Sequence, residues 1–338
     1  MRPIRRRDFA ELPPSLVAEV ERRLGAVRGF EERRGGFSDG VLGVAALAGG
    51  ERVFVKAVPA DGGDAAGYRE EAAVSAALPP GVPAPRLLFT DERDGWLLIC
   101  SELAPGRVPH EPWRPEELAA ALDLLTVCAR ELTPAPVDGL PTVAARMKGR
   151  CELWQDPGTA RLGAWERGHL ARLAEVEREW ESLVTGDTML HFDPRFDNIL
   201  IDERGTARLV DWGRACVGPD WVDLVCLLLE SELGDPDPEE VFAGHPLGRR
   251  AAPEGVDALL VTLLGYWTRT AVLPGPAHAP HLRERRALPP RHPRLARRPL
   301  GVKGPASRRR GYRAGWRARA RSCAGSRVRP APCRRGRG

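Results

Sequence analysis

The sequence lacks any long apolar run. Its longest candidate lies near Val222–Leu229, where the charged Asp223 interrupts it. A helix that spans a membrane needs about 20 consecutive apolar residues. Residues 1–14 contain four arginines but no apolar stretch after them, which argues against a secretory signal. We therefore expect a cytoplasmic protein with no membrane partner.

Cysteine is scarce and scattered. The seven cysteines lie at positions 100, 128, 151, 216, 226, 323 and 333, and no two of them form a C-x-x-C pair. An odd number at irregular spacing argues against a disulfide framework and against a zinc site. We expect all seven to be free thiols.

Acidic residues are almost absent from the C-terminal part. Residues 278–338 hold 20 of the 51 Lys and Arg residues but a single acid, Glu284. The other 277 residues therefore hold 31 basic and 45 acidic residues, a net charge of −14. An Arg- and Pro-rich segment without periodicity cannot bury a core, so we expect a disordered tail. The acidic body suits a cationic partner.

The remaining chain divides by its hydrophobic pattern. The first hundred residues alternate in the way of a small sheet, with a turn at Gly49-Gly50 and one prominent helix at Tyr68–Leu78. Later segments have helical spacing, apart from two short strands at Asn198–Ile201 and Ala207–Val210. We predict an α+β fold with a β-rich lobe at 1–101, a larger α-helical lobe at 102–277 and the basic tail at 278–338.

A motif typical of phosphoryl transfer lies in the second lobe. His191 and Asp193 begin an H-x-D-x-x-x-x-N sequence that ends at Asn198, and a D-x-G motif begins thirteen residues later at Asp211. An Asp in such a loop can accept the proton of a hydroxyl group, and an Asn five residues later can reach a metal ion. H-x-D alone is common and often only caps a turn. The combined spacing is much harder to obtain by chance.

Two features of the first lobe fit the same chemistry. Lys56 interrupts an apolar strand, where an ammonium group without a partner is costly. Glu70 and Glu71 both qualify as its partner, and we choose Glu71 because it shares a helix face with apolar residues. The glycine-rich turn at 35–40, with Gly36 and Ser38, could bring backbone N–H groups close to phosphates. Such turns usually only reverse the chain.

Along the chain the order is glycine-rich turn, strand lysine, helix glutamate, H-x-D-x-x-x-x-N and D-x-G. This order resembles the aminoglycoside-phosphotransferase and choline-kinase branch of the protein-kinase-like fold. The resemblance covers roughly residues 29–275 and implies an ATP- and Mg²⁺-dependent small-molecule kinase. It implies the following roles: Asp193 as the catalytic base, Asn198 and Asp211 as Mg²⁺ ligands, Lys56 and Glu71 as the phosphate clamp, Gly36 and Ser38 near the phosphates, Ser101 and Leu103 at the adenine, and Asp223 as a brace of the catalytic loop.

The acceptor is expected to be a small cationic molecule with a hydroxyl group, such as an aminoglycoside. Only eleven residues separate Asp211 from Asp223, which leaves no room for the peptide-docking segment of a protein kinase. The chain turns into the basic tail where the family continues with pocket helices, so the tail is either out-of-frame sequence or a genuine basic arm. Two other functions stay open: a catalytically silent kinase-like protein, and a nucleic-acid-binding protein that uses the tail.

Overall fold

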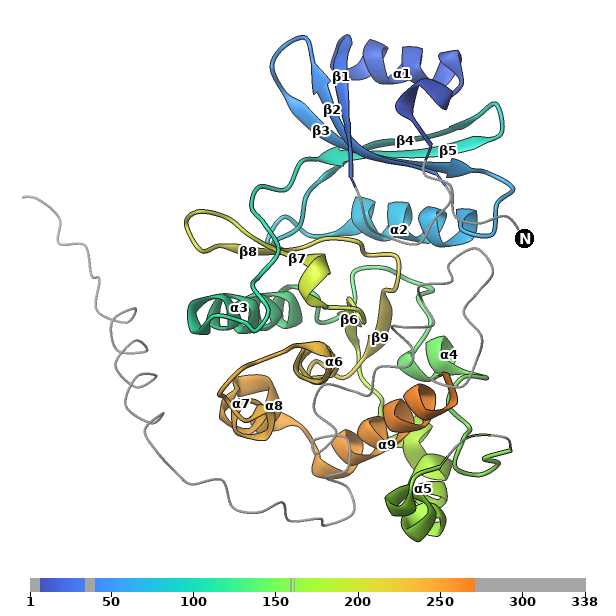
Figure 1. Ribbon diagram of the computed structural model, residues 1–338, viewed down its shortest axis with the longest axis vertical. Coiled ribbons are helices and arrows are strands. Elements are labelled where there is room, and N and C mark those ends of the chain that lie inside the picture. The colour runs from blue at the N-terminus through green and yellow to red at the C-terminus, as the bar shows by residue number, and fades with distance from the viewer. Residues whose placement is uncertain (1–6, 34–39, 159, 161, 271–338) are drawn as a thin grey trace, which may run out of the picture. The chain divides into compact units, whose positions relative to one another are not determined.

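The computed structural model describes residues 7–33, 40–158, 160 and 162–270. They form a mixed α+β fold with a small antiparallel sheet followed by a larger helical region (Figure 1), as the sequence predicts. The helices and strands are η1 (Phe9–Glu11), α1 (Pro14–Leu24), β1 (Val27–Glu32), β2 (Val41–Leu47), β3 (Arg52–Pro59), α2 (Ala65–Ala77), β4 (Leu87–Arg93), β5 (Trp96–Glu102), α3 (Pro115–Glu131), α4 (Val143–Met147), α5 (Ala164–Leu183), β6 (Thr188–Leu190), η2 (Phe196–Asn198), β7 (Ile199–Ile201), β8 (Ala207–Leu209), β9 (Cys216–Gly218), α6 (Val222–Glu230), α7 (Pro238–Gly244), α8 (Pro246–Arg250) and α9 (Pro253–Thr270).

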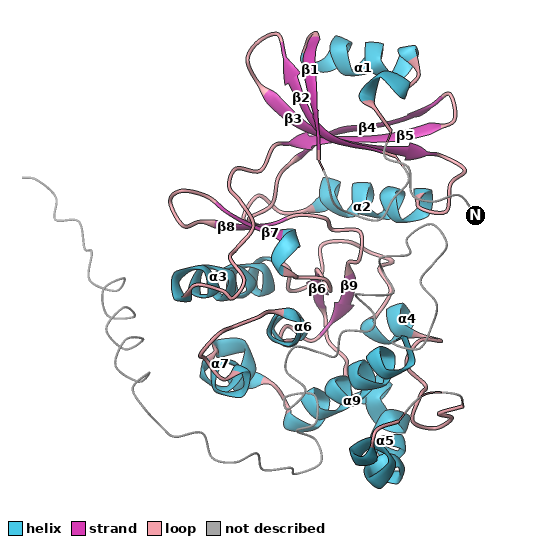
Figure 2. Ribbon diagram, viewed as in Figure 1, coloured by secondary structure: helices cyan, strands magenta, loops and turns pink. Residues whose placement is uncertain are grey.

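The first lobe is a five-stranded antiparallel sheet in the order β1-β2-β3-β5-β4. One face packs against α1, with Leu16 and Val20 against Val55 and Leu98. The other face meets α2 (Figure 2). Side chains of successive strand residues point to opposite faces. The central strand β3 therefore sends Val55 toward α1 and Lys56 toward the α2 side.

The second lobe has one large apolar core. Helix α9 has apolar residues at helical spacing, among them Val256, Leu259, Leu260 and Leu263, all of which are buried. It packs along α5, while α3 contacts α6 and the short strands β6, β7 and β8. Two small antiparallel ladders form here, β6 with β9 and β7 with β8, and the segments with the H-x-D-x-x-x-x-N and D-x-G motifs connect their strands.

A short connection joins the two lobes after β5. Arg107 forms two backbone hydrogen bonds with Ile201 of β7, at 3.1 and 2.8 Å. The preceding Gly106 has φ of 111°, and a Cβ atom there would lie 2.4 Å from the carbonyl oxygen of Ile201. Only glycine fits this approach without strain. The connection is thereby fixed to the strand that follows the predicted catalytic loop.

Most predicted elements lie within a few residues of their expected ends. The predicted helix Tyr68–Leu78 corresponds to α2, and the predicted strands Asn198–Ile201 and Ala207–Val210 correspond to β7 and β8. The glycine-rich turn with Gly36 and Ser38 lies outside the described residues, as does the predicted tail at 278–338. Among the helices that the structure describes, none is long and apolar enough to cross a membrane.

Candidate active site

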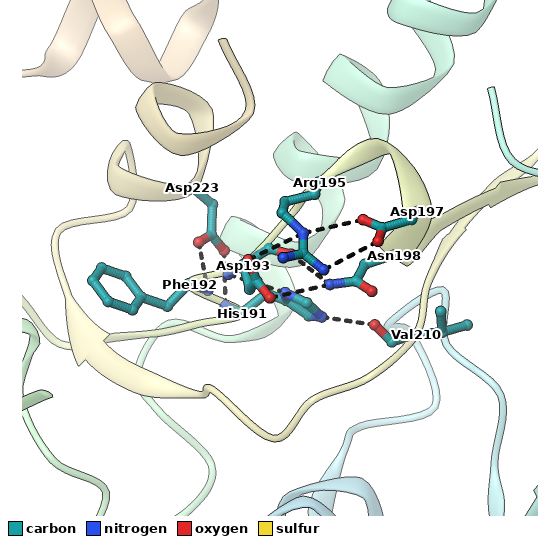
Figure 3. Close-up of polar contacts among 8 residues, drawn as sticks. All are labelled: His191, Phe192, Asp193, Arg195, Asp197, Asn198, Val210 and Asp223. Carbon is teal, nitrogen blue, oxygen red and sulfur yellow. Dashed lines mark hydrogen bonds and ion pairs between the residues drawn. The ribbon is translucent and has the colours of Figure 1, made fainter. Parts of the chain in front are cut away.

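The loop between β6 and β7 carries the H-x-D-x-x-x-x-N motif and is held by a buried carboxylate. Asp223, in the first turn of α6, accepts hydrogen bonds from the backbone N–H groups of His191 and Phe192, both at 2.8 Å (Figure 3). Phe192 has φ of 63°, a left-handed conformation that a bulky residue rarely adopts. The two hydrogen bonds compensate this strain. Burial raises the pKa of Asp223, although both N–H donors favour its ionised form.

His191 is fully buried and links this loop to the next motif. Its Nε2 atom lies 2.9 Å from the carbonyl oxygen of Val210, which can only accept a hydrogen bond. The proton therefore lies on Nε2, and Nδ1 accepts the backbone N–H of Asp193 at 3.3 Å. Burial lowers the pKa of His191, which favours this neutral form. The residue fixes the spacing between the loop and the strand that leads to Asp211.

Asp193 and Asn198 face each other across the loop. The Asn198 side-chain amide donates to the backbone carbonyl of Asp193 at 2.9 Å and to its Oδ2 atom at 3.3 Å. The nitrogen and oxygen of the amide diverge from the same trigonal carbon, and the Asn198 oxygen points away from Asp193 (Figure 3). Arg195 lies 3.5 Å from the Asp193 carboxylate and 3.0 Å from that of Asp197. It is mostly buried rather than a plain surface arginine, with its side chain 17% exposed.

A second group of charged side chains brings together β3 and α2 of the first lobe and the segment after β8 of the second. Lys56 of β3 contacts Glu71 of α2 at 2.6 Å and Asp211, two residues after β8, at 3.1 Å. Lys56 and Glu71 are nearly buried, whereas the Asp211 side chain is 51% exposed. Burial opposes the charge of Lys56, but the two carboxylates raise its pKa. The same ammonium group lowers the pKa of Asp211, so both side chains are charged at neutral pH.

Glu70 and Glu71 have different partners. The structure pairs Lys56 with Glu71, whereas Glu70 contacts Arg146. Ser101 lies within β5, in register with Phe54 of β3, and Leu103 follows the strand directly in the connection between the lobes. Sequence reasoning missed Arg146, because a single arginine in a five-residue helix carries no motif.

The donors at this site suit a magnesium ion that is shared with phosphates. Asp211 supplies a half-exposed carboxylate, and Asn198 supplies an amide oxygen turned away from Asp193. Mg²⁺ in phosphate-transferring enzymes uses one or two carboxylates and completes its shell with phosphate oxygens and water. Among the described residues, no group of three or more His, Cys, Asp or Glu side chains would hold a metal ion by itself. Asn198 and Asp211 could hold such an ion together with phosphate oxygens.

Comparison with known families gives the class of the protein. Residues 30–259 match the model of the phosphotransferase enzyme family, APH. This range includes most of both lobes and all the site residues described above. The chain belongs to this family. The match confirms the predicted family and the predicted enzyme class, a small-molecule kinase.

Solved structures share the fold at low sequence identity. An aminoglycoside phosphotransferase, APH(4)-Ia, in a thermostable form with ADP and hygromycin B, has a TM-score of 0.54 and 15% identity over 86% of this chain and 100% of its own. The choline kinase LicA of Streptococcus pneumoniae has a TM-score of 0.53 and 13% identity, over 81% and 96%. A putative fructosamine-3-kinase of Thermobifida fusca has a TM-score of 0.52 and 21% identity, over 84% and 99%. These likenesses confirm the predicted kinase-like fold. No curated protein matches the sequence significantly.

Proposed function

We propose that this enzyme transfers the γ-phosphate of ATP, with Mg²⁺, to a hydroxyl group of a small cationic molecule. The observation that carries the proposal is the contact of Lys56 with both Glu71 and Asp211, which joins three motifs from distant parts of the chain. A lysine held between two carboxylates is charged and has a fixed position. Such a cation can bind the phosphates of a nucleotide.

In this mechanism Asp193 accepts the proton of the acceptor hydroxyl. The hydroxyl oxygen forms a bond to the γ-phosphorus while the bond from that phosphorus to the bridging oxygen breaks, and ADP leaves. A bound Mg²⁺ would neutralise charge on the phosphates. Asn198 and Asp211 would hold it, and Lys56 would bind the α- and β-phosphates. Arg195, 3.5 Å from Asp193, keeps positive charge next to the base.

The other assignments follow from this mechanism. We propose that residues 1–101 form the nucleotide-binding lobe and 102–277 the catalytic and acceptor lobe. Ser101 and Leu103 would meet the adenine, and Gly36 and Ser38 the phosphates. The fold is shared with enzymes whose names include aminoglycosides and choline, which supports a cationic acceptor. The proposal includes no nucleic acid or membrane partner, and we propose that the enzyme acts in the cytoplasm.

Titration calorimetry with the ATP analogue AMP-PNP, with and without Mg²⁺, tests the nucleotide half. We expect Mg²⁺ to tighten binding in the native protein and to have no effect in Asp211→Ala. The matched control is Asp220→Ala, which removes a carboxylate of the same lobe that pairs with Arg250 away from the site. Affinity that is indifferent to both Mg²⁺ and Asp211→Ala would exclude this assignment.

Turnover against aminoglycosides, amino alcohols and neutral sugars tests the acceptor. A cationic acceptor should bind more weakly as salt rises, because salt screens exposed charges beyond about 10 Å at 0.1 M. A neutral sugar that is phosphorylated faster than every cation contradicts the acceptor class. Nucleotide binding without turnover of any compound favours the silent kinase-like protein.

A further inference from the structure

Helix α2 carries two adjacent glutamates that point to different partners. Glu71 binds Lys56 of the sheet, as described above. Glu70 accepts hydrogen bonds from both terminal guanidinium nitrogens of Arg146 in α4, with Nη1 at 3.2 Å from Oε2 and Nη2 hydrogen-bonded to Oε1. Adjacent residues of a helix point about 100° apart. One helix is therefore attached both to its own lobe and to the second lobe.

Arg146 is fixed by the segment that follows Asp211. Its Nη2 atom donates to the carbonyl oxygen of Ala215 at 2.5 Å, and its side chain is only 15% exposed. The start of α4 is attached to β9, which begins directly after Ala215, because Val217 donates its N–H to Pro141 at 2.8 Å. Thr142 caps the helix by accepting the N–H of Ala145. Arg146 and the chain after Asp211 therefore form one body.

We propose that Arg146 is a positioning residue that holds helix α2 against the segment after Asp211. In this way it keeps Lys56 and Asp211 in contact across the two lobes. The guanidinium group is the only side chain that joins Glu70 of the first lobe to the Ala215 carbonyl of the second among the described contacts. Lys56 contacts Glu71 of α2 and Asp211 at the same time, so keeping both contacts requires α2 and this segment to stay close together. The proposal rests on the proposed function, because the contact between Lys56 and Asp211 would serve nucleotide and metal binding.

The contact requires an arginine in particular. A planar guanidinium group can bind a carboxylate through two nitrogens and still donate to a carbonyl. A lysine has a single ammonium group and cannot reproduce that geometry. Arg146→Lys should therefore be intermediate between the native protein and Arg146→Ala, although the charge is unchanged.

Helix α2, which carries Glu70, also offers a closely matched control. Arg69 binds Glu92 through two nitrogens, at 3.0 and 2.7 Å, and donates to the carbonyl of Ala60 at 3.0 Å. These are the same kinds of contact that Arg146 makes, but all three residues belong to the first lobe. Arg69→Ala removes an arginine–glutamate pair of α2 without touching the contact between the lobes.

Two measurements test the proposal. The first is hydrogen exchange of the free protein, in which Arg146→Ala should accelerate exchange in α2 and in residues 211–216 together. Arg69→Ala should leave 211–216 unchanged. The second is calorimetry with AMP-PNP, in which Arg146→Ala should weaken Mg²⁺-dependent affinity roughly 5- to 50-fold, a typical coupling between distant groups. Without Mg²⁺ the loss should be smaller.

Glu70→Ala removes the other end of the same contact and keeps Arg146, so it should repeat both effects even if Arg146→Ala fails to fold. Equal behaviour of the Arg146 and Arg69 variants in both measurements would overturn the proposal. Absence of nucleotide binding by the native protein would instead overturn the proposed function. In that case hydrogen exchange alone still decides whether Arg146 joins the two lobes.

Discussion

The loop with Asp193 and the group around Lys56 differ in how they are held. The loop depends on hydrogen bonds within one lobe, from backbone N–H groups to the buried Asp223. The Lys56 group depends on side-chain ion pairs, of which Lys56–Glu71 lies within the first lobe and Lys56–Asp211 joins the two lobes. Hydrogen bonds within one packed body resist small movements of the lobes, whereas a contact between lobes is lost when they separate. The proposed base, Asp193, is thus held within one lobe, whereas the position of Lys56, the proposed phosphate-binding cation, depends on how the lobes meet.

The largest expected effect is the loss of turnover when Asp193, the proposed base, is replaced. Asp193→Ala should lower turnover by roughly 10²- to 10⁴-fold, because the acceptor proton then has no positioned base. Nucleotide affinity should change little, since Lys56 pairs with Glu71 and Asp211. Asp197→Ala is the control, as it removes a neighbouring carboxylate that pairs with the same arginine. Steady-state kinetics combined with AMP-PNP calorimetry checks both parts, and equal losses in the two variants would contradict the assignment.

Removing the brace of the loop should cost stability as well as turnover. Asp223→Ala leaves the N–H groups of His191 and Phe192 buried without partners, each at a cost of roughly 1 to 3 kcal/mol. The free energy of unfolding in urea should fall by about 2 to 5 kcal/mol. Asp223→Asn keeps one acceptor oxygen, so its free energy of unfolding should fall less than that of Asp223→Ala. If the alanine variant is as stable as the native protein, Asp223 does not hold the loop as the geometry indicates.

Loss of the cation between the lobes should affect binding more than stability. Lys56→Met should weaken AMP-PNP binding roughly 10- to 100-fold, because a charge-assisted contact to phosphate is removed. Glu71 is then left buried without its partner and should take up a proton. Lys148→Met is the control, since that lysine is exposed and lies in the second lobe. Calorimetry of both variants decides whether Lys56 has the proposed role.

The smallest effect concerns the acid stability of the connection between the lobes. Burial raises the pKa of Glu117, but hydrogen bonds from His110, Arg107 and Arg114 lower it from 4.5 to about 2. The ionised carboxylate therefore stabilises the fold above pH 4.5, and this stabilisation is lost as the pH falls toward 2. Glu117→Gln should remove roughly 1 to 3 kcal/mol at pH 7.

Urea denaturation at pH 7 and pH 3 measures this dependence. The difference in unfolding free energy between the unsubstituted protein and Glu117→Gln should shrink at the lower pH. At that pH Glu117 takes up a proton more readily in the unfolded chain than in the folded one, which favours unfolding. Glu131→Gln serves as the control on the same helix, where the carboxylate pairs with Arg130 near the surface. A difference that is independent of pH would show that Glu117 acts through packing alone.

Local sequence signals account for much of the fold. Strands β2 and β3 lie on either side of the predicted turn at Gly49-Gly50, because β-branched and small apolar residues flank it. Helices α3 and α5 have clear periodicity and proline or glycine at their starts. The three-residue strands β6 and β9 carry no such signal. They exist because distant segments pair in the folded chain, and no local propensity predicts that contact.

The sequence alone indicated Asp193, Asn198 and Asp211 as candidate site residues, since they lie close together in the chain and their spacing forms a motif. It also favoured Glu71 as the partner of Lys56, through the apolar face of its helix. Only the tertiary structure gave Glu70 a partner in Arg146 and turned Asp223 toward two backbone N–H groups. Both contacts join segments more than thirty residues apart, and their geometry depends on how buried elements pack rather than on the residues next to them.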